Sequence, residues 1–225
     1  MKHGYGIIYT LMALSLVIAG IFLAFLPDQV PMHYNITGEI DRFGSKYENL
    51  LLPFFSVLMG FMMTGMAKYH KRRGERGNEK TLVITGIFCV LFFDLMEIYF
   101  LWKAAAYPAG GVQTNGPDAM KFVSMILGAL LIFCGNIMPK AGRNAVFGLR
   151  TRWSMKNDRV WQQSQRFCGY ACVVCGLLMI LVGLFVSGAA NLLAVLGLVI
   201  VWAVVSAAAS YRICKKDGAD REKES

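Results

Sequence analysis

Two acidic residues inside a long apolar run are the side chains of this chain most able to do chemistry. Asp94 and Glu97 lie three positions apart, which places both carboxyls on one face of a helix. An ionisable group inside a membrane is costly, so such a pair is by default a functional-site hypothesis. Three interpretations compete: a structural ion pair with a lysine, a cation site completed by His33, and a proton relay. The lysines considered for the first are Lys46, Lys103 and Lys121.

His33 lies in the polar stretch of residues 27–49, two positions after Pro31. A lone loop histidine is more often an organiser of hydrogen bonds than a ligand, and a metal site of His33, Asp94 and Glu97 is the weaker hypothesis. The sequence contains no HExxH, P-loop or Gly-x-Ser-x-Gly pattern. We therefore expect a protein that is not an enzyme and that uses no cofactor.

Three of the six cysteines, Cys168, Cys172 and Cys175, share one face of a predicted helix. Cysteine is a small apolar residue that packs well between helices. No histidine is near enough in sequence to complete a zinc pattern. We expect these thiols to serve packing, and we expect no disulfide framework because none of the six lies in an outer loop.

The residues that must position these side chains belong to six apolar runs. The chain has 225 residues, of which 56% are hydrophobic and 16% are charged, so it is far more apolar than an ordinary soluble domain. The runs are residues 6–26, 50–67, 81–102, 119–137, 167–187 and 192–211. Each has about 18–22 residues, close to the roughly 20 that a helix needs to cross a bilayer. The sequence predicts an all-α integral membrane protein with six transmembrane helices.

The Lys and Arg residues predict the orientation of these helices. With a cytoplasmic N-terminus, the outer connections hold only Arg42, Lys46, Lys103 and Lys121, which leaves 19 of the 23 Lys and Arg residues inside. Short cytoplasmic loops carry this excess in membrane proteins. We expect both termini in the cytoplasm of a bacterium, with the chain crossing the cell membrane. The net charge of +9 is explained by this topology, so nucleic-acid binding is not expected.

Four segments follow from this topology. Residues 1–67 form a two-span unit with the outer loop 27–49, where Pro and Gly residues predict turns. Residues 68–118 contain a basic inner loop, the third span and a Gly-rich outer loop. Residues 119–211 form a three-span region that contains a basic inner segment, 138–166. The mixed-charge tail, residues 212–225, is expected to be disordered.

The inner segment 138–166 has an internal order of its own. Pro139 is expected to end the fourth helix. Ser154 or Asn157 could cap the next helix, which would carry Asp158 in its first turn. The residues predicted to share one face of that helix are Val160, Trp161, Ser164 and Phe167. Two interpretations stay open: an interfacial anchor at the headgroups, and a docking surface for a cytoplasmic partner.

Residues 135–169 also resemble the signature of the SdpI immunity protein family. The matching residues are Gly135, Asn136, Met138, Pro139, Lys140, Asn144, Gly148, Arg150, Thr151, Trp153, Val160, Trp161, Arg166 and Gly169. The chain departs from the family pattern at four positions, which are Arg152, Ser154, Met155 and Gln165. These departures put partner specificity in doubt more than membership.

Residues 27–53 resemble the small domain of unknown function that is common at the N-terminus of the same family. The matching residues are Pro27, Pro31, His33, Asn35, Gly38, Asp41, Gly44, Lys46 and Pro53. The two motifs occur in the family's order and within six spans, so the resemblance covers most of the chain.

The resemblance implies a membrane protein that protects its producer against a secreted peptide toxin, and not an enzyme. The best-known member of the family also holds a small autorepressor at the membrane, so a cytoplasmic repressor is a second implied partner. On this interpretation the loop 27–49, with Asp94 and Glu97, meets the toxin or organises the fold. The inner segment would offer Arg150, Arg152, Trp153 and Trp161 to a partner. The alternatives are an ion-coupled transporter that uses Asp94 and Glu97, and a metal-binding protein or enzyme that uses His33.

Overall fold

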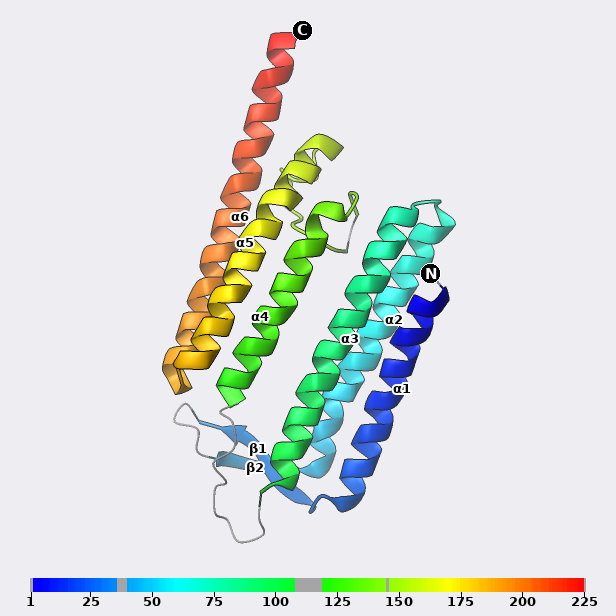
Figure 1. Cartoon of the computed structure of the whole chain (residues 1–225), viewed down its shortest axis with the longest axis vertical. Coiled ribbons are helices and arrows are strands. Elements are labelled where there is room, and N and C mark those ends of the chain that lie inside the picture. The colour runs from blue at the N-terminus through cyan, green and yellow to red at the C-terminus, as the bar shows by residue number, and fades with distance from the viewer. Residues whose placement is uncertain (1, 36–39, 108–118, 145, 225) are drawn as a thin grey trace.

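Six long helices dominate the computed structural model, which describes residues 2–35, 40–107, 119–144 and 146–224 (Figure 1). The helices are α1 (Lys2–Phe25), α2 (Leu51–Arg72), α3 (Arg76–Ala105), α4 (Ala119–Ile137), α5 (Asp158–Phe185) and α6 (Gly188–Glu224). All six are long and apolar enough to cross a membrane. The prediction of six membrane-spanning helices is therefore confirmed at the level of helix number, length and composition.

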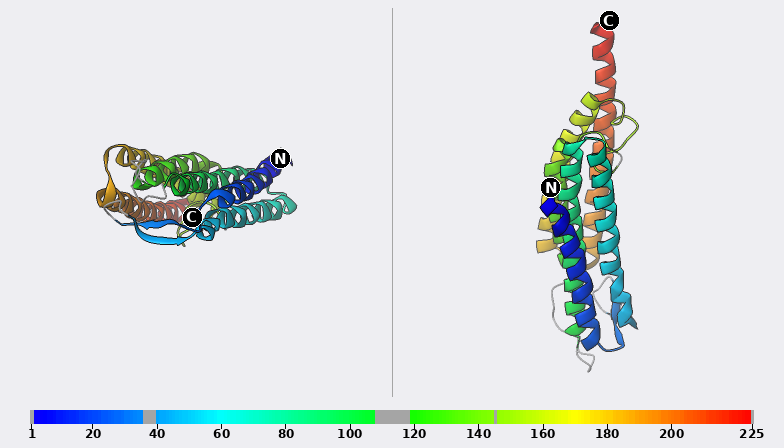
Figure 2. Two further views of the ribbon diagram at one scale, coloured as in Figure 1. Left: turned by 90° about the horizontal axis from the view of Figure 1, so that it is seen from below. Right: turned by 90° about the vertical axis from the view of Figure 1, so that its right-hand side faces the viewer.

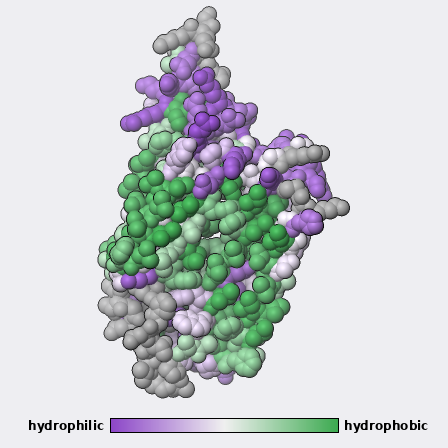
Figure 3. Space-filling view, in the orientation of Figure 1, coloured by the Kyte–Doolittle hydropathy of each residue, from purple (hydrophilic) through white to green (hydrophobic). Residues whose placement is uncertain are grey.

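The helices pack as two groups of three, α1–α3 and α4–α6, with a thinner contact between α3 and α4. Seen end-on, the bundle is wider than it is deep (Figure 2). A core of buried residues reaches from Ile8 and Met63 in the first group to Ile137 and Cys168 in the second. On the face shown in Figure 3, apolar side chains cover most of the middle of the bundle, as lipid contact requires.

The two ends of the bundle differ. The N-terminal end of α1, the α2–α3 turn, the segment between α4 and α5, and the far end of α6 lie together (Figure 1). We call this the basic end. The opposite end carries a small antiparallel β-hairpin of β1 (Gln29–Tyr34) and β2 (Ile40–Ser45), followed by the 3₁₀ helix η1 (Lys46–Leu50). We call it the hairpin end.

The hairpin is a finding that the sequence did not predict, because turns alone were expected in residues 27–49. Val30 of β1 is wholly buried against Leu26, Leu101 and Ala104, so the loop is anchored on the ends of α1 and α3. The two strands bring Val30 opposite Gly44 and His33 opposite Arg42. The predicted site residue Gly38 lies outside the described residues, as does most of the Gly-rich loop before α4.

The tail was predicted to be disordered, and this was wrong for the described part of it. Residues 212–224 continue α6 as a regular helix beyond the apolar stretch. Asp217 is 4% exposed in this extension, and its Oδ2 accepts a hydrogen bond of 2.9 Å from Nδ2 of Asn157. This bond ties the extension to the segment that precedes α5, a contact that composition alone does not reveal.

Candidate functional site

The hairpin holds its charged side chains mostly in pairs with one another. Nδ1 of His33 lies 2.6 Å from Oδ1 of Asp41, and Arg42 donates to Glu48 at 2.8 Å. Ser45 and Glu48 form a capping box at the start of η1. His33 is exposed, with 63% of its side chain accessible. The structure therefore supports the interpretation of His33 as an organiser of hydrogen bonds at the surface.

Lys46 ties the hairpin to the end of α1. Its Nζ lies 3.1 Å from Oδ1 of Asp28 and donates to the carbonyl oxygen of Leu26 at 3.3 Å. A Cβ at Gly44 would meet the carboxyl end of Glu48 and the side chain of Met32, so both side chains would have to shift. Pro31 is buried in β1, and the structure places Asn35 just after that strand.

Asp94 and Glu97 lie in the half of α3 nearer the hairpin, and both are buried. Their hydrogen-bond partners come from the neighbouring helices. Ser56 of α2 donates to Oδ1 of Asp94 at 2.7 Å, and Ser15 of α1 donates to Oε2 of Glu97. The predicted partner Lys46 is engaged elsewhere, so the lysine ion pair was the wrong interpretation at that residue. Neither serine could be singled out from the sequence, since a single Ser in an apolar run has many uses.

The predicted metal site of His33, Asp94 and Glu97 is not formed. Among the described residues, no three His, Cys, Asp or Glu side chains come together so as to hold a metal ion. The reason is the hairpin, which turns His33 towards Asp41 at the surface while the two acids lie inside the bundle.

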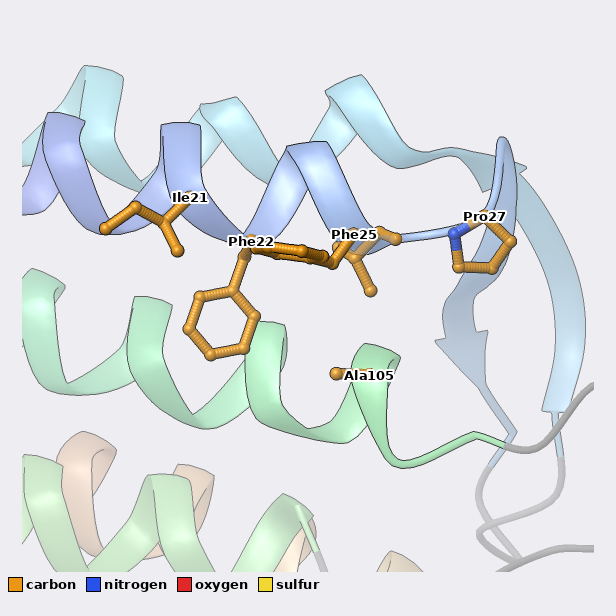
Figure 4. Close-up of a pocket in the computed structure, with 6 residues that line it drawn as sticks. Ile21, Phe22, Phe25, Pro27 and Ala105 are labelled. Carbon is orange, nitrogen blue, oxygen red and sulfur yellow. The ribbon is translucent and has the colours of Figure 1, made fainter.

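A small apolar pocket of about 280 Å³ lies beside the hairpin, at the ends of α1 and α3 (Figure 4). Its lining consists of Ile21, Phe22, Phe25, Leu26, Pro27 and Ala105. Phe25 is 86% exposed at its rim, although it is one of the largest apolar side chains of α1. The hairpin end thus combines a polar hairpin with an apolar recess directly beneath it.

At the basic end, the signature segment 138–166 is held together by its own side chains. Oδ1 of Asn144 accepts hydrogen bonds from the backbone N–H groups of Val146 and Phe147, at 2.9 and 2.8 Å. Gly148 has a φ of +103°, and a Cβ there would lie 2.4 Å from Oε1 of Gln165. Both residues therefore have a conformational role in the turn.

Gln165 explains one departure from the family pattern. It is wholly buried in α5, where its Oε1 accepts from the N–H of Leu149 and its Nε2 donates to the carbonyl of Leu149, both at 2.9 Å. The side-chain amide thus forms the same two hydrogen bonds with Leu149 that the backbone of a neighbouring β-strand would form. Ser154, a second departure, is also buried and donates to the same carbonyl at 2.8 Å.

Trp161 is wholly buried, and its Nε1 donates to the carbonyl oxygen of Ala141 at 2.8 Å. The expectation that Trp161 is offered to a partner is therefore wrong. Val160 and Ser164 are buried on the same face as predicted, but Phe167 is 41% exposed, because the buried stripe of α5 continues through Cys168 instead. Asn157 caps α5 as one of the two predicted residues, with its Oδ1 accepting from the N–H of Val160 at 2.8 Å.

Part of the segment lies against α6. Arg152 lies over the ring of Trp153 at 5.0 Å, and Trp153 meets Tyr211 of α6 edge-on. Thr151 bonds through its hydroxyl to Ser210 of α6 at 2.9 Å. Four more predicted residues, Asn136, Lys140, Arg150 and Arg166, are exposed, and Pro139 lies in the short 3₁₀ helix η2 (Met138–Lys140) after α4.

The glycines of the signature have a packing role that the sequence analysis missed. Gly135 of α4 and Gly169 of α5 approach so closely that a Cβ on either would lie 2.6 Å from the other's carbonyl oxygen. Gly128 and Gly176 repeat this contact one heptad away. The seven-residue spacing of glycines in both runs was the available signal. Cys172 packs at the same interface, where its Sγ donates to the carbonyl of Leu131.

His70 is also a structural residue. Its ring is buried, and its Nδ1 lies 2.6 Å from Oε2 of Glu75 in the α2–α3 turn. That contact, with a second hydrogen bond from Asn78, holds the pKa of Glu75 below its ordinary value. Neighbouring Glu79 accepts from the hydroxyl of Tyr5 at 3.1 Å.

Comparison with known proteins agrees with both motifs. Residues 140–210 match the model of the SdpI/YfhL protein family, and residues 10–57 match a domain of unknown function, DUF1648. The chain is 25% identical over 209 residues to the immunity protein SdpI of Bacillus subtilis (strain 168), which covers 92% of this chain and 93% of that protein. No solved structure matches. The two motifs, the six helices and this near full-length similarity are the features in which the chain is similar to the SdpI/YfhL protein family.

Proposed function

We propose that this membrane protein gives its cell resistance to a secreted peptide toxin, and that it acts by binding and not by catalysis. The observation that carries the proposal is the similarity to an immunity protein over 92% of the chain. It extends through both the hairpin end and the signature segment, and is therefore not confined to one motif.

The proposed orientation places the basic end in the cytoplasm and the hairpin end outside, in the bacterial cell membrane. The Lys and Arg distribution supports it. A membrane-impermeant thiol reagent tests it on intact cells. Cysteine at Asp28, whose side chain is 92% exposed, should be labelled, whereas cysteine at exposed Lys140 should react only after the cells are opened. The reverse pattern would overturn the orientation.

We propose that the toxin meets the hairpin end. A peptide that attacks the membrane from outside would reach this end first, and amphipathic membrane-active peptides carry apolar side chains on one face. The apolar pocket under Phe25 is the recess that could receive one such side chain (Figure 4). The polar hairpin above it, with His33 and Asp41 at its surface, would contact the polar face of the peptide.

Complementation tests immunity directly. A Bacillus subtilis strain without its own immunity protein SdpI is made to express this chain, and is then exposed to the toxin against which that protein protects. Survival above that of an empty-vector strain is the expected result. If cells whose membranes contain the intact protein die as readily as the vector control, immunity to that toxin is excluded.

Variants locate the toxin-facing surface within that assay. Ala105→Phe fills the pocket between α1 and α3, and should lower survival without lowering the amount of protein in the membrane. Ala190→Phe is the matched control, because Ala190 is exposed in the other half of the chain and is remote from the pocket lining. Equal survival of both variants would remove the pocket from the proposed surface.

The basic end is the proposed site for a small cytoplasmic repressor. Arg152 and Trp153 support this, because they are stacked on each other beside α6 and remain accessible. A fluorescently tagged repressor should move to the membrane only in cells that express the chain. Arg152→Glu should release it and leave toxin resistance unchanged, since the two surfaces lie at opposite ends of the bundle (Figure 1).

A further inference from the structure

The centre of the first three-helix group holds four polar side chains that the proposed immunity does not use. Ser15 comes from α1, Ser56 from α2, and Asp94 and Glu97 from α3. All four are at most 5% exposed. The hydroxyl of Ser15 donates to Glu97, and that of Ser56 donates to Asp94. Each acid is therefore bound by a serine of a neighbouring helix, and three helices meet at this cluster.

Each carboxyl has one oxygen that the cluster does not satisfy. Oδ2 of Asp94 and Oε1 of Glu97 are both buried and have no hydrogen-bond partner among the described residues. A buried acceptor without a donor destabilises the fold, and more so when it is charged. Two ionised carboxylates on adjacent turns would also repel one another in a medium of low dielectric. The cluster therefore lacks a positive charge or a donor.

No side chain of the described residues supplies it. The hydrogen bonds of the two carboxyls go to the serines, and Lys46 is paired with Asp28. Lys103 of α3 and Lys121 of α4 lie nearer the hairpin end than either acid. On the hairpin, His33 is paired with Asp41 at the surface. The titratable groups of α1 and α2 lie towards the basic end. Those whose side chains are described are His3, Tyr5, Tyr9, Lys68, Tyr69, His70, Lys71 and Arg72.

We propose that Asp94 and Glu97 hold one proton between them, which makes the cluster a proton-binding site inside the membrane. A hydronium ion transfers its proton to one of the two free oxygens, so that an O–H bond forms and water leaves. The new O–H donates to the free oxygen of the other carboxyl, and a single proton thereby satisfies both. The formal charge of the pair falls from −2 to −1, and Ser15 and Ser56 stabilise the charge that remains.

The site lies closer to the hairpin end, since Asp94 is 11 positions from the end of α3 at Ala105 and 18 from its start at Arg76. It also joins all three helices of its group. Loss of the proton would leave two like charges at their junction, so proton binding and the packing of α1, α2 and α3 are linked. This property does not depend on whether the chain recognises a toxin.

Infrared spectroscopy of the full chain in lipid nanodiscs tests the proposal. At pH 7 we expect a C=O stretching band of one protonated carboxyl per chain, shifted downward in D₂O, because ionised carboxylates lack this band. Asp94→Asn combined with Glu97→Gln should remove the band. Asp158→Asn, which changes an exposed carboxyl at the basic end, should leave it unchanged. The single variants Asp94→Asn and Glu97→Gln keep the side-chain shape. If they stay folded and their band differs from that of the wild type, the loss of the band in the double variant does not follow from unfolding.

Two results would overturn the proposal. The first is the absence of a protonated carboxyl band in the folded wild-type protein at pH 7. The second is a band equal to two carboxyls, which would mean that each acid carries its own proton. Unfolding temperature measured in NaCl and in choline chloride adds an independent readout. A saturable increase with Na⁺ that the double variant lacks would assign the site to a metal cation instead.

Discussion

In the first three-helix group, α1, α2 and α3 meet through serine hydroxyls and two buried carboxyls, whereas in the second group α4 and α5 meet backbone to backbone at glycines. Glycines occur at contacts in both groups, but their neighbours differ. A Cβ on Gly60 of α2 would meet the flexible end of Met12, while one on Gly176 of α5 would meet the carbonyl oxygen of Gly128. The same residue type thus allows a side chain to fill a gap in one group, and brings two backbones together in the other.

The comparison shows that helices of similar apolar composition can be joined in two ways inside one bundle. Membrane helices lack a hydrophobic driving force between them, so they associate through close packing and interhelical hydrogen bonds. The group α4–α6 uses close packing, which is rigid. The group α1–α3 uses polar contacts and methionine side chains, which adapt more readily. Four experiments test this distinction, and they are ordered from the largest expected effect to the smallest.

Trp161→Ala should destabilise the protein most. Removal of a wholly buried Trp costs about 3–5 kcal/mol, and it also removes the hydrogen bond to Ala141. The matched control is Trp153→Ala, because Trp153 is only partly buried and lies at the surface of the same segment. Chemical denaturation in detergent micelles measures both. Equal losses of unfolding free energy in the two variants would show that close packing around Trp161 is not what holds the segment 138–166 to the second group.

Gly176→Ala should cost about 1–3 kcal/mol, because the new methyl meets a backbone atom that cannot move away alone. Gly60→Ala should cost much less, since the side chain of Met12 can change its rotamer. Gly197→Ala on α6 meets open space, and it reports the gain in helix propensity alone. The same denaturation assay compares all three. A larger loss of unfolding free energy for Gly60→Ala than for Gly176→Ala would contradict the proposed difference between the two helix groups.

Ser15→Ala and Ser56→Ala should each cost about 1–3 kcal/mol, because each leaves a buried carboxyl oxygen without its donor. Ser164→Ala in the second group is the matched control. Ser164 is equally buried, but its hydroxyl has no partner among the described residues, so its removal should be nearly neutral. A double-mutant cycle of Ser56→Ala with Asp94→Asn measures the coupling directly. Additive effects would mean that the hydroxyl and the carboxyl act independently.

The smallest effect concerns Glu75 in the turn between α2 and α3. The contact with His70 lowers its pKa in the folded protein, so its stabilising effect is complete above the unfolded pKa of about 4.3. That effect is lost as the pH falls through the lower folded pKa. Wild-type protein should therefore lose more unfolding free energy than Glu75→Gln when the pH falls from 6 to 3. Parallel curves for the two proteins would contradict this assignment.

The positions of the six spans could be predicted from the sequence, but their ends could not. Apolar runs report the thickness of the bilayer, whereas a helix continues as long as its backbone is favourable and its side chains find contacts. Lys and Arg are good helix formers and extend to the headgroups. For this reason α2 continues to Arg72, α5 begins at Asp158, and α6 reaches Glu224.

The candidate site was predicted in part for a similar reason. An acid inside an apolar run is conspicuous, so Asp94 and Glu97 could be singled out. Their partners Ser15 and Ser56 are 38 or more positions away, and a single serine in an apolar helix is unremarkable. His33 was associated with the acids because all three residues were expected near the same membrane surface. Only the pairing of β1 with β2 shows that it contacts Asp41 instead.

The two bonds between α6 and the signature segment have a mechanical consequence. Ser210 and Asp217 lie seven residues apart, two turns along one face of a continuous helix, and they hold Thr151 and Asn157. A rotation of α6 about its axis must therefore either break both bonds or drag the segment with it. The apolar part of α6 is also the least buried of the six helices, so lipids contact most of it. A change in the bilayer would therefore act on α6 before the other helices.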